Sequence, residues 1–243
     1  MSMDTEPHDQ TRGETTPVFR DAQAAPLSCN EAASLCTKAA RGAGMSWGMA
    51  EEAGFAVAWL VSHGIDGPSH LRAHLERSDG RAWSELCPSV TPGLWRNAAR
   101  QPNCPIILGA TLCDYATLPE GPSSGRTLTL GPVSAPLLLV PFLAVLAHDN
   151  HLALTLTWET GRVCIDDQDV WLQRAARALS VLELDLALTA RAARYHHPCA
   201  TTKPKAHTTA DTVAALNTLA MRTTVPATEA SRAGAGSTLS DND

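Results

Sequence analysis

The stretch "LALTLTWETGRVCID", Leu152 to Asp166, decides the fold of this chain. Its first half alternates large apolar residues with small or polar ones, which is typical of a strand with one buried face. The residues "ETG" then predict a turn, and "RVCID" alternates in return. An antiparallel hairpin is therefore expected, with four large side chains of the first strand facing the core: Leu152, Leu154, Leu156 and Trp158.

More strands are predicted on both sides of this hairpin. The segments "PIILGATLCDYATL" from Pro105, Pro132 to Ala147, and "VWLQR" from Val170 all read as strands. The segment "LSVLELDLALTA" alternates again and predicts four leucines on one face: Leu182, Leu184, Leu186 and Leu188. Together these strands predict a central meandering antiparallel sheet with one buried face.

Helix signals flank the predicted sheet. Ser28 and Glu31 fit a capping box that opens the first helix, and Gly42 and Gly44 end it. A second helix is expected from Ser46 to about Gly64, and a third from about Pro68. The last helix is expected from Ala210 to Met221, followed by an ordered tail. The fold class is therefore α+β, with amino-terminal helices, the central sheet and a carboxy-terminal helix.

The chain of 243 residues divides into two parts by composition. Residues 1–26 are polar and are expected to be disordered, because they contain too little apolar surface to offset the entropy of ordering. Residues 27–243 are expected to form a single α+β domain.

Charge and apolar content exclude several classes of partner. The net charge is −6, so neither nucleic acid nor an anionic membrane surface is an expected partner. The longest apolar run is shorter than the roughly 20 residues that a membrane span needs. The seven cysteines include no Cys-x-x-Cys pair, which favours a cytoplasmic protein with mostly buried, inert thiols.

Two histidine groups were considered as metal ligands. His70 and His74 are spaced to share one helical face, and His196 and His197 with Cys199 follow in a distant loop. The zinc-protease pattern requires a glutamate after the first histidine, where this chain has Leu71. Solvent-facing histidines are therefore the preferred interpretation; no metal site is predicted, and no cofactor can be assigned from the sequence.

Glu52 is a candidate acid or base. On the second helix, Glu52, Trp59 and His63 project within a narrow arc beside the apolar stripe. A carboxylate at the edge of a core has a raised pKa, which suits proton transfer. An amphipathic helix with half-exposed border residues explains the same pattern without any catalytic role.

Two segments of the chain have an arginine just before a pair of spaced glycines. The first includes Arg41, Gly42, Gly44 and Trp47; the second runs through Glu229, Ser231, Arg232, Gly234 and Gly236. Backbone N–H groups in such turns converge on anions, and arginine adds a fork of donors. The two segments predict a site for an anionic ligand, with Glu229 or Glu52 as the proton-transferring group. A helix end accounts equally well for the first segment.

These two ends carry a resemblance to a known family. "SCNEAASLCTKAARGAGMSWGMAEEAG", from Ser28, and "TTVPATEASRAGAGSTLSDND", from Thr223, resemble the opening and closing signatures of a bacterial family. That family is a domain of unknown function a little over two hundred residues long, in which an aromatic residue more often stands at the position of Thr224. The resemblance implies that the tail belongs to the folded unit, and it implies no activity.

Two functions compete at this point. One is an enzyme or binding protein for a small anionic metabolite, held between the Arg41–Gly44 turn and the Arg232–Gly236 segment. The other is a non-catalytic accessory protein that uses its sheet and carboxy-terminal segment to bind a partner subunit or a second copy. Glycine-rich polar segments favour the first function, and the lack of an assembled catalytic motif favours the second.

Overall fold

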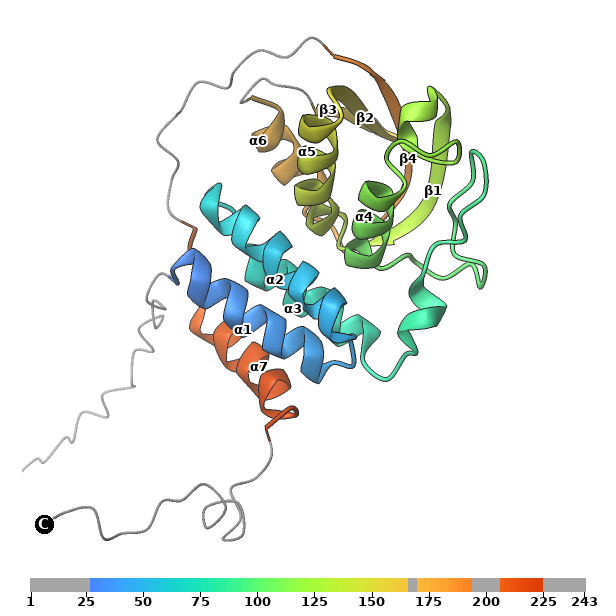
Figure 1. Ribbon diagram of the computed structural model, residues 1–243. Helices are drawn as coiled ribbons and strands as arrows, with labels where there is room; N and C mark the ends of the chain where they lie inside the picture. The colour runs from blue at the N-terminus through green and yellow to red at the C-terminus, as the bar shows by residue number, and fades with distance from the viewer. Residues whose placement is uncertain (1–26, 166–169, 194–205, 225–243) are drawn as a thin grey trace, which may run out of the picture.

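The computed structural model describes residues 27–165, 170–193 and 206–224. Four helices gather beside one another, and three further helices accompany the sheet (Figure 1). The first group comprises α1 (Cys29–Gly42), α2 (Trp47–Ser62), α3 (Gly67–Ser78) and α7 (Ala210–Met221). The second comprises α4 (Pro105–Asp114), α5 (Val140–Asp149) and α6 (Val170–Leu179). The predicted disordered segment 1–26 and the predicted ordered tail from residue 225 lie outside the described residues.

The sheet confirms the α+β class. It consists of β1 (Thr127–Ser134), β2 (Leu152–Trp158), β3 (Gly161–Ile165) and β4 (Glu183–Ala192), and every pairing is antiparallel. The strand order is β1-β4-β2-β3, so the predicted meander is wrong in its order. The chain passes through α6 after β3 and returns as β4 between β1 and β2, which leaves β2 and β3 as the sequential hairpin.

The hairpin itself is confirmed. Leu154 pairs with Ile165 and Leu156 with Val163, and all four side chains are buried. Leu152 and Trp158 at the strand ends are partly buried and pack against the core. On β4, Leu186 and Leu188 are buried and Leu184 is partly buried, but Leu182 precedes the strand and is 61% exposed. The prediction of a shared buried face was therefore wrong for Leu182.

Three predicted strands are helices instead. Pro105 opens α4, the apolar run from Pro132 leaves β1 after Ser134 and continues as α5, and Val170 begins α6. Short or uniformly apolar segments show no clear period in their sequence. A strand and a helix that are buried on both sides therefore have the same apolar pattern and cannot be distinguished by it. The prolines also contributed to the wrong prediction, because proline usually interrupts a helix. Pro105 and Pro141 instead lie in the first turns of helices, where the missing N–H has no partner to lose.

The amino-terminal helices follow their sequence signals closely. Ser28 and Glu31 form the reciprocal capping box of α1, with hydrogen bonds of 2.8 and 3.2 Å. Ser46 caps α2 by accepting from the N–H of Met49. The apolar faces of α1 and α2 then pack on each other around buried alanines and Cys36.

The last helix, α7, begins and ends where the sequence predicts and is fixed to both α1 and α3. Gly42 brings the end of α1 so close to α7 that a Cβ atom there would lie 1.9 Å from the carbonyl oxygen of Leu219. On α3, Arg72 forms an ion pair with Asp211 of α7. Beyond the helix ends, Arg222 forms a forked pair with Asp79, at 2.8 and 3.2 Å.

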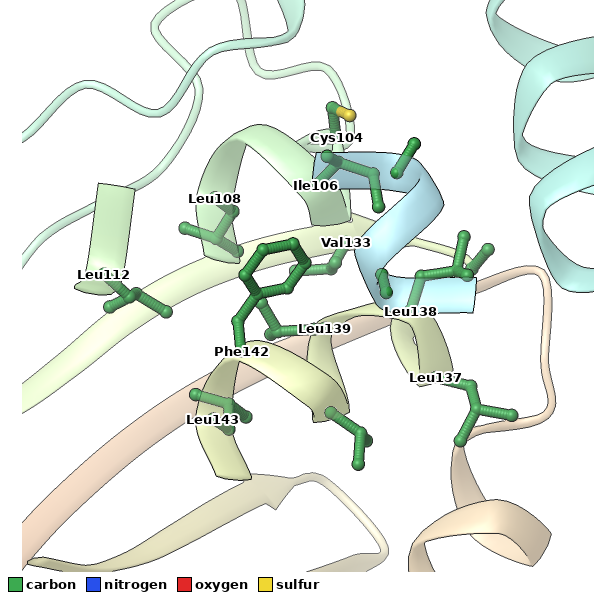
Figure 2. Close-up of a cluster of buried hydrophobic side chains, with 14 of the residues drawn as sticks. Cys104, Ile106, Leu108, Leu112, Val133, Leu137, Leu138, Leu139, Phe142 and Leu143 are labelled. Carbon is green, nitrogen blue, oxygen red and sulfur yellow. The ribbon is translucent and has the colours of Figure 1, made fainter. Parts of the chain in front are cut away.

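The core continues from the helices into the sheet. Figure 2 shows the ring of Phe142 of α5 beside Val133 of β1 and among leucines of α4 and of the segment before α5. Leu108, Leu112, Leu138 and Leu139 in this cluster are all fully buried. Within the described part of the chain, no helix combines the length and the apolar character needed to cross a bilayer.

Candidate functional site

A polar pocket of about 220 Å³ opens where α3 meets the sheet. We call it the α3 pocket. Seven polar side chains from α3, the sheet and the intervening loops line it: His74, Arg77, Ser78, Arg81, Gln101, Ser134 and Glu183. The volume is below the 300–1,000 Å³ typical of pockets for drug-sized molecules, so a small ligand fits it best.

The helix α3 supplies one wall of the α3 pocket. His74, Arg77 and Ser78 lie three and four residues apart, so they project from the same side of the helix. Asp66 caps the start of α3 by accepting from the N–H of Ser69, and the helix ends at Ser78, just before Arg81. The Ser78 hydroxyl donates to the His74 carbonyl at 2.9 Å, so it is engaged within the helix. The basic side chains of α3 face the pocket.

Two strand ends supply the opposite wall. Ser134 is the last residue of β1 and Glu183 is the first residue of β4, and the antiparallel register pairs them directly. Arg77 joins this wall to α3, because its guanidinium donates to the Leu182 carbonyl and to Glu183, each at 2.9 Å. Arg77 therefore fixes the geometry of the pocket and balances the charge of Glu183.

Arg81 and Gln101 complete the polar rim. The Arg81 guanidinium donates to the Gln101 side-chain oxygen at 3.4 Å, a long hydrogen bond that a stronger acceptor would outcompete. Arg77 and Arg81 together outnumber Glu183, the carboxylate among the lining residues. In a chain with a net charge of −6, the α3 pocket is therefore a locally positive site.

Three buried side chains contact one another in series at the floor of the α3 pocket. His74 Nδ1 lies 3.1 Å from Ser134 Oγ, and His74 Nε2 lies 3.2 Å from Cys104 Sγ. Cys104 is fully buried, and His74 is only 1% exposed. The expectation of solvent-facing histidines was therefore wrong for His74, which bridges a hydroxyl and a thiol inside the protein.

The backbone around Cys104 explains why these three groups meet. Asn103 runs beside the end of β1, donating its N–H to the Pro132 carbonyl and accepting from the N–H of Ser134, at 2.8 and 3.1 Å. Cys104 then stands at the N-cap position of α4, followed by Pro105. Its N–H donates to the Leu86 carbonyl at 3.1 Å, which ties it to the loop on the other side of the pocket.

Burial keeps both partners uncharged. It raises the pKa of the Cys104 thiol to about 12, although the N–H groups of Ile107 and Ile106 oppose the shift. It lowers the pKa of His74 from its ordinary value of 6.5 to about 3, helped by the charge of Arg77. At neutral pH the pair is therefore a protonated thiol beside a neutral imidazole.

The suppressed protonation of His74 predicts acid sensitivity. Below about pH 6.5 the unfolded chain protonates this imidazole while the folded protein does not, so stability falls as the pH falls toward 3. The slope contributed by His74 is at most about 1.4 kcal/mol per pH unit. Urea unfolding at pH 7.5 and 5.0 measures it, and the variant His74→Gln should show a flatter dependence than the parent.

His70 is the matched control for that measurement. Its pKa is also lowered by burial, but it is only partly buried and lies next to Ser180 at 3.4 Å. His70→Gln should therefore change the pH slope much less than His74→Gln. Equal slopes in the parent and in His74→Gln would contradict a neutral, buried His74.

The first predicted anion segment forms a helix end. The N–H groups of Ala43, Gly44 and Met45 donate to carbonyls of α1, with Gly44 at a positive φ of 100°. Arg41 donates to the Met45 carbonyl at 2.5 Å and lies over the ring of Trp47, 5.3 Å from its centroid. Gly42 serves the contact with α7. These donors are thus engaged within the fold, and Trp47 is 64% exposed beside them.

Glu52 lies partly buried on α2. Partial burial raises its pKa, and the carboxylates of Asp114 and Glu51 raise it further. The raised pKa matches the direction expected from the sequence. Trp59 and His63 stack on each other one turn apart, with ring centroids 3.8 Å apart. The charged groups that raise the pKa of Glu52 are thus carboxylates, including that of Asp114 at the end of α4, rather than a basic side chain.

Other predicted residues cannot be placed. Glu229, Ser231, Arg232, Gly234 and Gly236 lie outside the described residues, and so do His196 and His197. The proposed site between the Arg41–Gly44 turn and the carboxy-terminal segment therefore stays a prediction. Among residues 27–165, 170–193 and 206–224, no group of three or more His, Cys, Asp or Glu side chains is arranged to hold a metal ion.

Sequence reasoning missed most of the α3 pocket. Cys104 was interpreted as an inert thiol, and Ser134, Arg77, Arg81 and Gln101 carried no motif. One signal was present: a cysteine directly before Pro105 and an apolar run is typical of an N-cap followed by proline at the first helical position. That interpretation would have placed Cys104 at the positive end of a helix.

Comparison with known proteins adds a family relationship over part of the chain. Residues 27–104, less than half of the chain, match the model of a family described as "Protein of unknown function (DUF3726)". No curated protein and no solved structure matches the chain. The matched range covers α1, α2, α3 and the loop that leads to Cys104. This chain is therefore similar, over its amino-terminal helices, to a family whose function is unknown.

Proposed function

We propose that this protein binds a small carboxylate-bearing metabolite in the α3 pocket. The observation that carries the proposal is that two arginines, Arg77 and Arg81, line the pocket together with a single glutamate, Glu183. The small polar pocket therefore has a net positive charge. The planar fork of an arginine matches a carboxylate, so Arg81 is the ligand-holding group. Arg77 acts as its support, because it is already bonded to Glu183 and to the Leu182 carbonyl.

The cysteine content supports a cytoplasmic location for this function. No disulfide joins any of the cysteines in the described segments. Thiols persist in a reducing compartment, where soluble metabolites with carboxylates are abundant. The alternative, an accessory protein that binds a partner subunit, requires no ligand in this pocket.

The test measures stabilisation by succinate. A ligand that binds the folded state raises the unfolding free energy by RT ln(1 + [L]/Kd), so the melting temperature should rise with succinate concentration. Arg81→Gln should weaken binding by about tenfold or more, because a hydrogen bond to a charged group contributes about 1.5–3 kcal/mol. Arg162→Gln on β3 removes the same charge from an exposed position and should leave the titration unchanged.

Two results would contradict the proposal. One is a melting temperature that does not respond to succinate or to sodium phosphate, with sodium chloride at equal ionic strength as the reference. The other is an equal loss of stabilisation in Arg81→Gln and Arg162→Gln, which would indicate general salt screening rather than a site. Retained binding of a partner protein without any ligand response would favour the accessory function.

A further inference from the structure

A nucleophile, a base and an orienting group lie in one line below the α3 pocket. The Cys104 thiol is 3.2 Å from His74 Nε2, and His74 Nδ1 is 3.1 Å from the Ser134 hydroxyl. A nucleophile in hydrogen-bond reach of a base that a third group orients is the arrangement found in covalent catalysis. His74 and Ser134 also line the α3 pocket, so this row of three side chains reaches the place where a ligand would lie.

We propose that Cys104 is the nucleophile of an acyl-transfer reaction, with His74 as its general base and Ser134 as the residue that positions His74. The substrate class is a carboxylate-bearing ester or thioester, whose carboxylate Arg81 holds. The substrate class rests on the proposed anion binding, whereas the nucleophile rests on the Cys104–His74 geometry alone.

The reaction has two balanced steps. In the first, Cys104 Sγ bonds to the acyl carbon, its proton passes to His74 Nε2, and the carbon–leaving-group bond breaks. The leaving alcohol or thiol takes the proton from His74. In the second, water attacks the acyl-cysteine with His74 again as base, which releases a carboxylic acid and restores the thiol. This sequence needs His74 Nδ1 to carry the hydrogen, which it then donates to Ser134 Oγ.

The start of α4 supplies groups for the developing negative charge. Pro105 has no N–H, and the N–H groups of Ile106 and Ile107 lie at the Cys104 thiol. N–H groups in the first turn of a helix lack partners within the helix, so they are suited to an oxyanion. Figure 2 shows Cys104 and Ile106 together at this helix start.

Access to the thiol passes Leu86. Cys104 is fully buried, whereas Leu86 is 3% exposed, lines the α3 pocket and accepts the Cys104 N–H with its carbonyl. Leu86 ends a short 3-10 helix (Trp83–Leu86) in a connecting segment, and we expect a shift of its side chain to open a path from the pocket toward Sγ. Shortening this side chain should therefore increase, rather than decrease, the reactivity of Cys104.

Burial sets the resting protonation states of the pair. It raises the pKa of Cys104 and lowers that of His74, so the thiol is protonated and the imidazole neutral before reaction. Both shifts oppose transfer of the proton from the thiol to the imidazole, so the transfer has to occur together with attack on the acyl carbon. This differs from a preformed thiolate–imidazolium pair, in which His74 would be charged.

The experiment follows acylation of the full-length protein by p-nitrophenyl hydrogen succinate, with peptide mass mapping of the labelled cysteine. Cys36 is the internal control, because it is as buried as Cys104, burial also raises its pKa, and its helix α1 contains no histidine. Cys104 should be acylated at least about 100-fold faster than Cys36, since general-base assistance contributes 10²–10⁴-fold.

Four variants separate catalysis from folding. Ser134→Ala should slow acylation of Cys104 about tenfold and alter its pH profile, and Ser134→Thr should restore both, because threonine keeps the hydroxyl. Leu86→Ala should accelerate labelling of Cys104 and leave Cys36 unchanged. His74→Gln should lose the 100-fold advantage of Cys104; if that variant does not fold, the serine pair and Leu86→Ala still decide the question.

Comparison with p-nitrophenyl acetate, which has no carboxylate, separates the two proposals. Equal preference for Cys104 with both esters would support the nucleophile and overturn the carboxylate site at Arg81. Stabilisation by succinate without selective acylation of Cys104 in either the parent or Leu86→Ala would overturn the nucleophile and leave the anion site standing. Acylation of Cys104 and Cys36 at equal rates would overturn the nucleophile as well.

Discussion

The variant Phe142→Ala is expected to lose about 3–5 kcal/mol of unfolding free energy, the cost typical of removing a buried aromatic ring. Phe142 is 2% exposed, and Figure 2 shows its ring among side chains of α4, the segment before α5 and β1. On α4 it faces Gly109, where an added Cβ would lie 2.3 Å from the ring. The ring therefore fills the space between two helices, and its removal leaves a cavity that their backbones cannot close. Urea unfolding at pH 7.5 measures the loss.

Phe55 is the matched control for this variant. It pairs edge-to-face with Phe142, with ring centroids 5.5 Å apart, but it is 39% exposed. Phe55→Ala should therefore lose only about 1–1.5 kcal/mol, close to the value of an aromatic pair plus a little buried area. Equal losses in the two variants would contradict the assignment of Phe142 to the core.

A second-site substitution tests the shape of the contact. Gly109→Ala alone should destabilise the protein, because its Cβ meets the Phe142 ring. In a Phe142→Ala background the same substitution meets empty space and should be neutral or stabilising. The two substitutions should therefore be strongly non-additive, as residues in direct contact are. Additive effects would mean that Gly109 and Phe142 do not touch.

Gly42→Ala is expected to lower the unfolding free energy by about 3 kcal/mol, at the upper end of the usual cost of overpacking. Two effects oppose each other at this position. Alanine favours the helical backbone of α1 by about 0.5–1 kcal/mol over glycine. The added Cβ, however, would lie 1.9 Å from the Leu219 carbonyl oxygen and 2.7 Å from its carbonyl carbon. The obstacle is backbone rather than a flexible side chain, so α7 has to move and the clash prevails.

Gly48 provides the control for the helix-propensity effect. It lies in the first turn of α2, is exposed, and an added Cβ there meets nothing within 4 Å. Gly48→Ala should leave stability unchanged or raise it slightly. Urea midpoints for the two alanine variants should therefore move in different directions. A Gly42→Ala midpoint equal to that of the parent would show that α1 and α7 are not in close contact.

Local signals in the sequence determined several elements of this protein. The capping box of Ser28 and Glu31, the Ser46 cap and the bounds of α7 depend on residues within a few positions of each other. The β2–β3 hairpin likewise follows from alternation and a short turn. Each signal works because the backbone groups at a helix end or a turn are satisfied by neighbouring residues.

Tertiary structure alone decided the helices α4, α5 and α6 and the place of β4. Their segments are apolar without a clear period or too short to show one, so their conformation depends on what packs against them. The position of β4 between β1 and β2 depends on pairing between residues 30 or more positions apart, which no local pattern encodes. Proline at the second position of α5 became favourable only because a helix begins there.

The candidate site shows the same division. The sequence indicated that His74 lies on a helix, whereas its prediction of an anion site concerned the Arg41–Gly44 and Arg232–Gly236 segments and not this pocket. It did not bring His74 to Cys104 and Ser134, which lie 30 and 60 residues further along the chain. Those contacts exist because Asn103 pairs with the end of β1 and α3 packs across both. A single helix or strand fixes which side chains share a face, but only the packing of distant elements fixes which chemical groups meet.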